Sequence, residues 1–283
     1  MTSQTIGVLH PGEMGVTVGA SARAGGSRVL WASEGRSAQT RERAAAAGLE
    51  DAKTLASVCA ASGVILSICP PHSALDLARV VVAQGFSGVY VDGNAVSPGT
   101  ARDIGRIIER AGAIFVDGGI IGPPARARGT TRLYLSGEQA APIARLFAQG
   151  PLEAIALDGG PGAASALKMA YAAYTKGTAA LLVSIRALAI QAGVDQALLG
   201  EWARSQPELG ARSERAAGET ARKAWRFAGE MAEIAATFDD AGLPDGFFRA
   251  AAEIYESLAG YKDAPSMPSV AEVAKALAGR PRD

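Results

Sequence analysis

Short apolar runs alternate with helical patterns through the first half of the chain. The runs lie at residues 5–9, 28–32, 64–69, 89–92, 113–116, 131–136 and 154–157. Helical patterns follow several of them, at residues 16–24, 73–84, 99–111 and 138–148. Apolar strands that alternate with helices at this spacing indicate parallel βαβ units with right-handed crossovers. The first half is therefore predicted to be α/β, with a Rossmann-type, doubly wound, mostly parallel sheet.

The second half opens with an uninterrupted helical segment at residues 162–192, with no proline and one internal glycine, Gly177. Such a helix would span roughly 45 Å, and its apolar residues on every face predict burial on all sides. Further helices are expected at residues 197–206, 212–242, 246–258 and 270–277. We therefore expect a dinucleotide-binding domain at 1–160 and an all-helical substrate or dimerisation domain at 161–283, entered by a long interdomain helix. An apolar entry helix of this kind favours a homodimer formed through the helical domain.

Composition narrows the class of partner. Lysine plus arginine equals aspartate plus glutamate, 28 of each, so no net field favours nucleic acid or an anionic membrane. The cysteines, Cys59 and Cys69, are too few for a disulfide framework, and they and the two histidines lack metal-ligand spacing. A small-molecule substrate and no metal are expected. Met1 leads directly into a strand without a signal peptide, which predicts a cytoplasmic protein.

The turn after the first strand reads His10-Pro11-Gly12-Glu13-Met14-Gly15. A strand, a tight glycine turn and a helix of small residues are typical of a dinucleotide site, where phosphate lies at the helix N-terminus. Gly12 would let the pyrophosphate approach the backbone, and Gly15 would let the helix pack closely. An ordinary βα turn that needs small residues is the alternative. The candidate cofactor-binding residues here are His10, Pro11, Gly12, Glu13 and Met14.

The loop after the second strand bears on cofactor choice. An NAD site usually carries Asp or Glu at the end of this strand, where this chain has Ala32 and Ser33. Arg36, with the hydroxyls of Ser33 and Ser37, would hold a 2′-phosphate by charge-assisted bonds. These residues favour NADP, whereas Glu34, one residue late for the ribose contact, supports NAD.

Two later loops complete the expected cofactor site. Cys69, Pro70 and Pro71 follow one strand, and Asn94 follows the next. Open α/β sheets bind ligands at the carboxyl ends of their strands. We therefore expect these four residues to contact the cofactor, and Asn94 to contact the substrate as well.

These spaced segments resemble the β-hydroxyacid dehydrogenase and 6-phosphogluconate dehydrogenase superfamily. The family's glycine turn matches apart from His10, and its substrate loop corresponds to residues 92–98. A further segment corresponds to residues 117–123, and a glycine precedes a lysine by six residues, as Gly162 precedes Lys168. Residues 223–246 look like a smaller branch whose C-terminal domain is mostly of uncharacterised function.

The resemblance implies hydride transfer between a nicotinamide cofactor and a β-hydroxy acid or its carbonyl counterpart. Lys168 would be the catalytic general acid and base, because burial lowers the pKa of a lysine ammonium towards working pH. Ile121, Gly122 and Tyr171 join Asn94 as expected substrate contacts. An imine reductase on the same scaffold, or a cofactor-binding sensor with little turnover, remains an alternative.

Several residues depart from the family pattern. Ala95, Ile121 and Ala172 stand where polar residues are usual, and Gly229-Glu230 replaces a Lys-Asp pair. Arg226 is a further candidate for binding an anion. A more apolar pocket follows, with Ile120 and Tyr174 as further candidate walls. The sequence therefore suggests a substrate bulkier than a standard small hydroxy acid.

Overall fold

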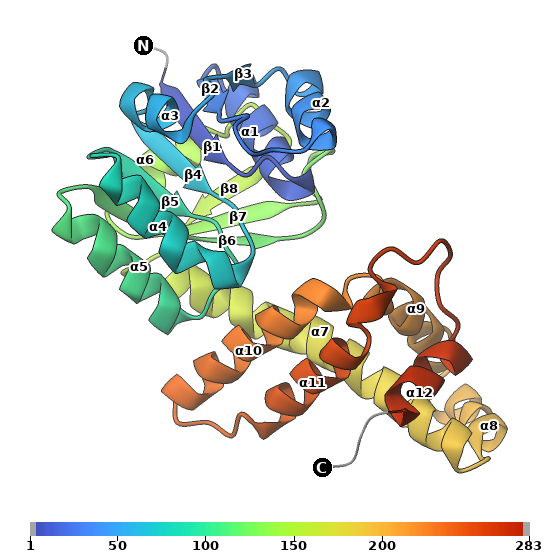
Figure 1. The fold of residues 1–283 in the computed structure, drawn as a ribbon. Helices are drawn as coiled ribbons and strands as arrows, with labels where there is room; N and C mark the ends of the chain where they lie inside the picture. The colour runs from blue at the N-terminus through green and yellow to red at the C-terminus, as the bar shows by residue number, and fades with distance from the viewer. Residues whose placement is uncertain (1–3, 280–283) are drawn as a thin grey trace. The chain divides into compact units, whose positions relative to one another are not determined.

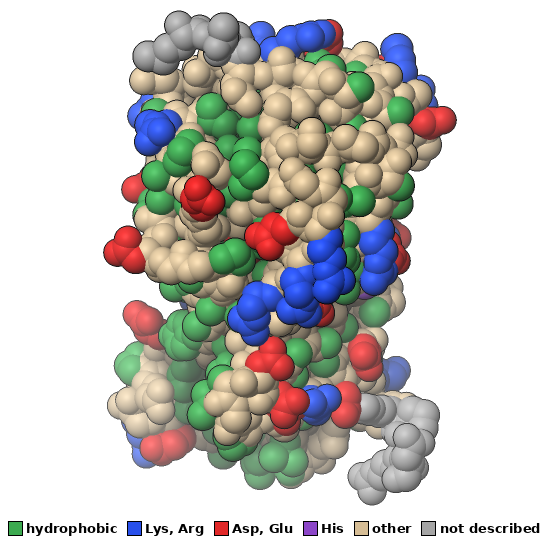
Figure 2. Space-filling model, turned by 90° about the vertical axis from the view of Figure 1, so that its left-hand side faces the viewer, with side chains coloured by type: hydrophobic (Ala, Val, Ile, Leu, Met, Phe, Trp, Pro, Cys, Tyr) green, Lys and Arg blue, Asp and Glu red, His purple; other side chains and the backbone are tan. Residues whose placement is uncertain are grey.

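The computed structural model describes residues 4–279, and its contacts divide the chain into two units. The first ends at Met169 and the second begins at Ala170, so the division falls inside helix α7 (Ala163–Gln191) rather than before it. No helix of residues 4–279 is long and apolar enough to cross a membrane. Acidic and basic side chains both appear on the face in Figure 2, with hydrophobic side chains between them.

The first unit is built on one eight-stranded sheet with the strand order β3-β2-β1-β4-β5-β6-β7-β8 (Figure 1). Neighbouring strands are parallel except β6 and β7, which are antiparallel. The strands are β1 (Thr5–Leu9), β2 (Arg28–Trp31), β3 (Glu50–Asp51), β4 (Val64–Ser67), β5 (Val89–Asp92), β6 (Ile114–Ile121), β7 (Arg132–Ser136) and β8 (Glu153–Ala156). The expected doubly wound, mostly parallel sheet is confirmed.

Helices cover both faces of this sheet (Figure 1). They are α1 (Glu13–Ala24), α2 (Ala38–Ala46), α3 (Leu55–Ala61), the short η1 (Pro71–Ser73), α4 (Ala74–Ala83), α5 (Pro98–Arg110) and α6 (Ala140–Arg145). One buried cluster joins α1 and α6 to the sheet, and a second joins α3, α4 and α5 to it. Alternation along the strands supplies both clusters, because successive side chains point to opposite faces: Val29 and Trp31 lie in the first and Leu30 in the second.

The second unit is entirely helical over its described residues. After α7 it contains α8 (Asp195–Ser205), α9 (Leu209–Ala221), α10 (Ala224–Asp240), α11 (Gly246–Ser257), the short η2 (Ala259–Tyr261) and α12 (Val270–Ala278). The expectation of one helix over residues 212–242 is wrong. The helix is interrupted after Ala221, and a new helix begins at Ala224. The two resulting helices pack against different partners: α9 contacts α12, and α10 contacts α11. Tertiary packing therefore overrides the continuous local helical pattern.

Candidate functional site

The turn between β1 and α1 keeps the backbone of a glycine turn although it begins with histidine. His10 has φ of 63°, a left-handed conformation that ordinarily favours glycine. A Cβ on Gly15 would lie 2.5 Å from the His10 carbonyl oxygen, so the turn requires glycine at 15. A Cβ on Gly12 would meet nothing nearer than that same oxygen at 3.9 Å. The surface over Gly12 is therefore open enough for a phosphate group to approach the backbone.

The other residues of this turn take separate places. Pro11 is buried, Glu13 is the exposed first residue of α1, and Met14 is half-buried against the core. The amide of Gly12 donates to the His10 carbonyl over 2.7 Å. The amides that begin α1 lack partners within the helix, which suits an anion at this end.

A small cavity of about 80 Å³ lies beside the turn and brings His10, Glu34 and Arg36 together. Its remaining walls are apolar: Val8, Leu9, Ala32, Leu55 and Leu77. Within residues 4–279, the buried His10 Nδ1 and Arg36 Nε atoms have no hydrogen-bond partner. Burial, then the Arg36 charge, lowers the pKa of His10 to about 4, so Arg36 is the cation here at neutral pH. The unpaired guanidinium nitrogen in this apolar slot is a charge-assisted donor for an anionic group.

Ser33 and Ser37 flank this cavity without lining it. The Ser37 hydroxyl accepts the Thr40 amide over 3.2 Å and so caps α2. The Ser33 carbonyl accepts the Arg36 amide at 3.1 Å and the Arg41 guanidinium at 3.3 Å. These bonds fix the loop that carries Arg36.

The loops after β4 and β5 are tied together by Asn94. Its Oδ1 accepts the Cys69 amide at 2.5 Å, and its Nδ2 donates to Ser67 Oγ at 3.1 Å and to Asp92. Asn94 is buried, whereas Pro70 is exposed and Pro71 begins η1. Burial, then the Asp92 charge, raises the pKa of the Cys69 thiol to about 12. Cys69 is therefore a neutral thiol at pH 7, not a nucleophilic thiolate.

Asp117 of β6 anchors the start of α7, a role that the sequence did not suggest. Its Oδ2 accepts the amides of Gly162 and Ser165, both at 2.9 Å, and the Ser136 hydroxyl at 3.0 Å. Its Oδ1 accepts the Ser165 hydroxyl at 2.6 Å. A buried carboxylate at a helix N-terminus satisfies amides that lack helical partners and complements the helix dipole. The only sequence signal was an acid near the end of an apolar strand.

Lys168 lies one turn after this anchor, against β6. A Cβ on Gly119 would lie 2.9 Å from the Lys168 Cβ and 2.7 Å from the Ala164 carbonyl oxygen. A Cβ on Gly118 would lie 2.9 Å from the Asp92 carbonyl oxygen. The glycine pair therefore lets the loop after β5 and the first turns of α7 approach the same strand.

The expected substrate residues occupy different positions around Lys168. Ile121, which is buried, shares a face of β6 with Gly119 because side chains alternate along a strand. Gly122 has φ of 123°, and a Cβ there would lie 2.3 Å from the Thr130 carbonyl oxygen, so backbone geometry requires it. Tyr171 follows Lys168 by three residues on α7 and belongs to the second unit. Its side chain is 47% exposed.

The fold and this arrangement define a doubly wound dinucleotide-binding protein. Residues 5–147 match the family described as the NAD binding domain of 6-phosphogluconate dehydrogenase, and residues 189–258 match a domain of unknown function, DUF1932. The chain thus belongs to the β-hydroxyacid dehydrogenase and 6-phosphogluconate dehydrogenase superfamily. Its first unit therefore matches an NAD-binding domain.

Individual proteins are also similar to this chain. An uncharacterised 28.5 kDa protein of Methanothermus fervidus is 34% identical over 167 residues, which span 59% of this chain and 63% of that protein. A conserved protein of unknown function, whose structure is similar to 3-hydroxyacid dehydrogenases, is 27% identical, with a TM-score of 0.66 over 91% of this chain and 98% of its own. The Mycobacterium tuberculosis 3-hydroxyisobutyrate dehydrogenase shares the fold at 17% identity and a TM-score of 0.68, with 98% and 99% coverage.

Proposed function

We propose that this protein transfers hydride between NADP and a β-hydroxy acid or the corresponding carbonyl compound. The observation that carries the proposal is the position of Lys168, which lies against the Gly118–Gly119 segment beside the loop after β5. That edge of the sheet is where open α/β folds bind their ligands. A basic side chain at this edge suits proton transfer to or from a substrate hydroxyl.

In this proposal the nicotinamide, when bound, accepts the hydride during oxidation or supplies it during reduction. Neutral Lys168 takes the hydroxyl proton as the C–H bond breaks, and the ammonium returns it in the reverse direction. Asp117 holds the helix that carries Lys168, and buried Ile121 keeps this face of β6 apolar. No described group of three or more His, Cys, Asp or Glu side chains is arranged to hold a metal ion.

The preference for NADP rests on Arg36. Its guanidinium lines the cavity beside the β1–α1 turn, and its Nε lacks a hydrogen-bond partner among residues 4–279. A 2′-phosphate accepts charge-assisted bonds from such a fork, whereas a ribose hydroxyl does not need it. The pyrophosphate would lie along the β1–α1 turn, in contact with Pro11, Gly12, Glu13 and Met14. The nicotinamide would lie near Cys69, Pro70, Pro71 and Asn94.

A cofactor titration tests this preference. NADPH is expected to bind more tightly than NADH, and Arg36→Ala is expected to weaken NADPH binding by about 10- to 100-fold, the loss of one or two charge-assisted bonds. The matched control is Arg79→Ala, which removes an exposed arginine of α4 that is paired with Asp76. Equal affinity for both cofactors in the wild type would assign the ribose contact to Glu34 and overturn the preference.

Turnover tests Lys168. Removal of a general acid and base lowers kcat by roughly 10²- to 10⁴-fold, so Lys168→Ala should lose that much while its NADPH affinity stays unchanged. Lys275→Ala, at an exposed position of α12, is the control. Turnover of Lys168→Ala within a few-fold of the wild type would exclude the proposed proton transfer.

The same assay separates the alternatives. Imine reductases are built on this fold, and turnover of a ketone with an amine, but never of a hydroxy acid, would favour imine reduction. Tight NADPH binding without turnover of any substrate would favour a sensor. For the dehydrogenase, the buried Ile121, on the same face of β6 as Gly119, favours a bulkier β-hydroxy acid. Higher kcat/KM for 3-hydroxyisobutyrate than for bulkier acids would contradict that substrate class.

We further propose a homodimer formed through the helical unit. Large apolar side chains of α7 remain exposed at a heptad-like spacing: Tyr171, Tyr174, Leu181 and Leu188, which are 47, 63, 43 and 68% exposed. A seam with this repeat suits packing against its own copy about a two-fold axis. Analytical ultracentrifugation of the wild type should show a dimer. The double variant Leu181→Glu, Leu188→Glu should sediment as a monomer. A wild-type monomer at micromolar concentration would refute the dimer.

A further inference from the structure

The helical unit contains a pocket of about 310 Å³, formed by residues of α7, α9, α10 and α11 and by Lys223. Its polar lining comes mainly from long basic side chains, and Phe227 and Leu182 supply apolar surface. A concave site of this size with a few converging polar groups is typical of small-ligand binding. All of its lining residues belong to the second unit.

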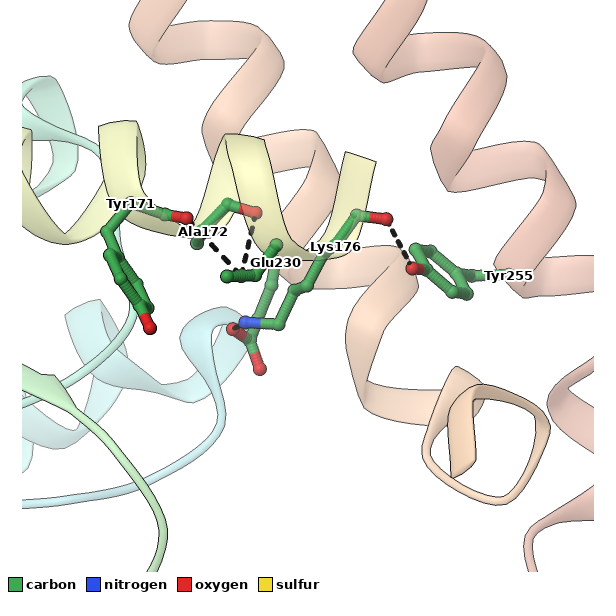
Figure 3. Close-up of polar contacts among 6 residues, drawn as sticks. Tyr171, Ala172, Lys176, Glu230 and Tyr255 are labelled. Atoms are coloured by element: carbon green, nitrogen blue, oxygen red, sulfur yellow. Dashed lines mark hydrogen bonds and ion pairs between the residues drawn. The ribbon is translucent and has the colours of Figure 1, made fainter. Parts of the chain in front are cut away.

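Lys176, which lines the pocket, belongs to a charge-balanced group of side chains with Glu230 (Figure 3). Lys176 forms an ion pair with Glu230, and the two side chains are 13% and 12% exposed. The Lys176 nitrogen lies 5.0 Å from the centre of the Phe227 ring, a cation–π contact. Phe227 packs edge-on against Tyr255 with ring centres 5.4 Å apart. The aromatic wall and the ammonium are therefore held in place together.

Tyr255 connects this group of side chains to the backbone of α7. Its hydroxyl donates to the Lys176 carbonyl oxygen over 2.7 Å (Figure 3). Burial, followed by the Glu230 charge, raises the pKa of the phenol well above its usual value. Tyr255 therefore stays protonated and remains a donor at physiological pH, and it adds no negative charge to the pocket.

The rim carries an excess of positive charge. Arg212, Arg215 and Lys223 all line the pocket, and none of the three forms an ion pair with another described residue. Arg212 instead contacts Tyr174, with 3.4 Å to its hydroxyl and 5.7 Å to its ring centre. Glu219 is the one acidic lining residue, so the rim has two charges more positive than negative.

Spacing on α9 concentrates this charge on one side of the helix. Arg212, Arg215 and Glu219 are separated by three and four residues, and Lys223 follows four residues later, beyond the helix end. Residues at these spacings lie on one helix face, where Arg212 and Arg215 form a destabilising like-charge pair and Glu219 is an opposite charge four residues after Arg215. An anionic ligand would offset that repulsion and would meet two guanidinium groups, which suit bidentate binding of phosphate or carboxylate.

We propose that this pocket binds a small organic dianion whose apolar body packs against Phe227. The net charge of +2 on the rim matches a phosphate monoester or a dicarboxylate, and both supply paired oxygen acceptors for Arg212 and Arg215. The lining of this pocket includes neither Lys168 nor any of the proposed cofactor-binding residues.

Calorimetric titration of the full chain with phenyl phosphate and, separately, phenylsuccinate tests the proposal. The solution contains saturating NADPH, which excludes either probe from the dinucleotide site. We expect saturable one-to-one binding of at least one probe, and the tighter probe identifies the anion class. Absence of saturable binding for both probes would overturn the proposal.

Paired variants assign the binding to this pocket. The double variant Arg215→Gln, Lys223→Gln should bind the probe about tenfold or more weakly. Each of its two substitutions removes a charge-assisted contact. Arg222→Gln removes a neighbouring exposed charge that does not line the pocket and should change affinity by less than about twofold. Equal losses in the two variants would mean general charge attraction and would refute the site. Phe227→Leu should weaken phenyl phosphate more than inorganic phosphate.

Discussion

The carboxylate of Asp117 should account for a measurable part of the stability of the first unit. It is fully buried and accepts four hydrogen bonds, from two amides at the start of α7 and from the hydroxyls of Ser136 and Ser165. Asp117→Asn keeps the volume and one acceptor oxygen but removes the charge. Asp117→Ala removes every acceptor and leaves buried amides without a partner.

The magnitude follows from these contacts. Hydrogen bonds to a charged group are about twice as strong as neutral ones, which contribute about 1 kcal/mol each. Three of the four donors approach Oδ2, so an amide oxygen there retains their geometry, and Asp117→Asn should lose about 2 kcal/mol. Asp117→Ala should lose about 4 kcal/mol, because each unsatisfied buried donor costs about 1–3 kcal/mol.

Urea unfolding followed by circular dichroism measures both losses without a known substrate. A loss of 2 kcal/mol corresponds to a fall in Tm of about 4–8 °C for a unit of this size. Asp158→Asn, at an exposed position shortly before α7, is the control and should stay within about 0.5 kcal/mol of the wild type. If Asp117→Asn matched that control, the carboxylate would not anchor α7, and our account of how Lys168 is positioned would be wrong.

Three further perturbations probe the same site. Gly119→Ala should cost about 1–3 kcal/mol, because its Cβ would meet Lys168 at 2.9 Å; Gly160→Ala, with open space around it, is the control in the same unfolding assay. Gly12→Ala should fold normally but bind NADPH more weakly in a titration. Gly15→Ala should lower the stability of the fold, because its added Cβ would lie 2.5 Å from a carbonyl oxygen. Equal stability of the two variants would refute this distinction. His10 has its folded pKa lowered from 6.5 to about 4, so burial of its neutral form contributes stability above pH 6.5 that is lost as pH falls towards 4. His10→Asn, which tolerates positive φ, should therefore flatten the stability profile between pH 6.5 and 4 by up to about 3 kcal/mol, and an unchanged profile would contradict the burial of His10.

The strands with the clearest sequence signal have side chains buried on both faces, although β8 was also predicted and its residues are half-buried or exposed. Val64–Ser67 of β4 is buried throughout, so its apolar run is continuous and easily recognised. The strand β3 was missed because it is two polar residues, Glu50 and Asp51, held by backbone pairing to Leu30 and Trp31. The helix α2 was missed because it buries only Ala44, so no apolar stripe marks it.

The backbone geometry of the candidate cofactor turn was the part of the site most open to prediction, because it is local. The turn from His10 to Gly15 is contiguous, and the residue type indicates the requirement at Gly15, although it does not indicate the positive φ of His10. Asp117 was not predictable, because two of its donors, Gly162 and Ser165, lie 45 and 48 residues away. Its role depends on β6 and the start of α7 meeting in space. The pocket between α7, α9 and α10 was missed because it needed the break after Ala221, which no proline or glycine marks.

Burial explains why the departures from the family pattern alter recognition rather than simply weaken it. Ile121 is 4% exposed and Ala172 is 1% exposed, where polar residues are usual. A polar side chain buried there would need hydrogen-bond partners of its own, and burying one without a partner costs free energy. The apolar residues remove that requirement, and under the proposed function the polar groups of the substrate would contact Lys168 and backbone amides instead. We therefore expect the proposed substrate to carry a larger apolar surface, since hydrophobic burial would replace the lost directional contacts in its binding free energy.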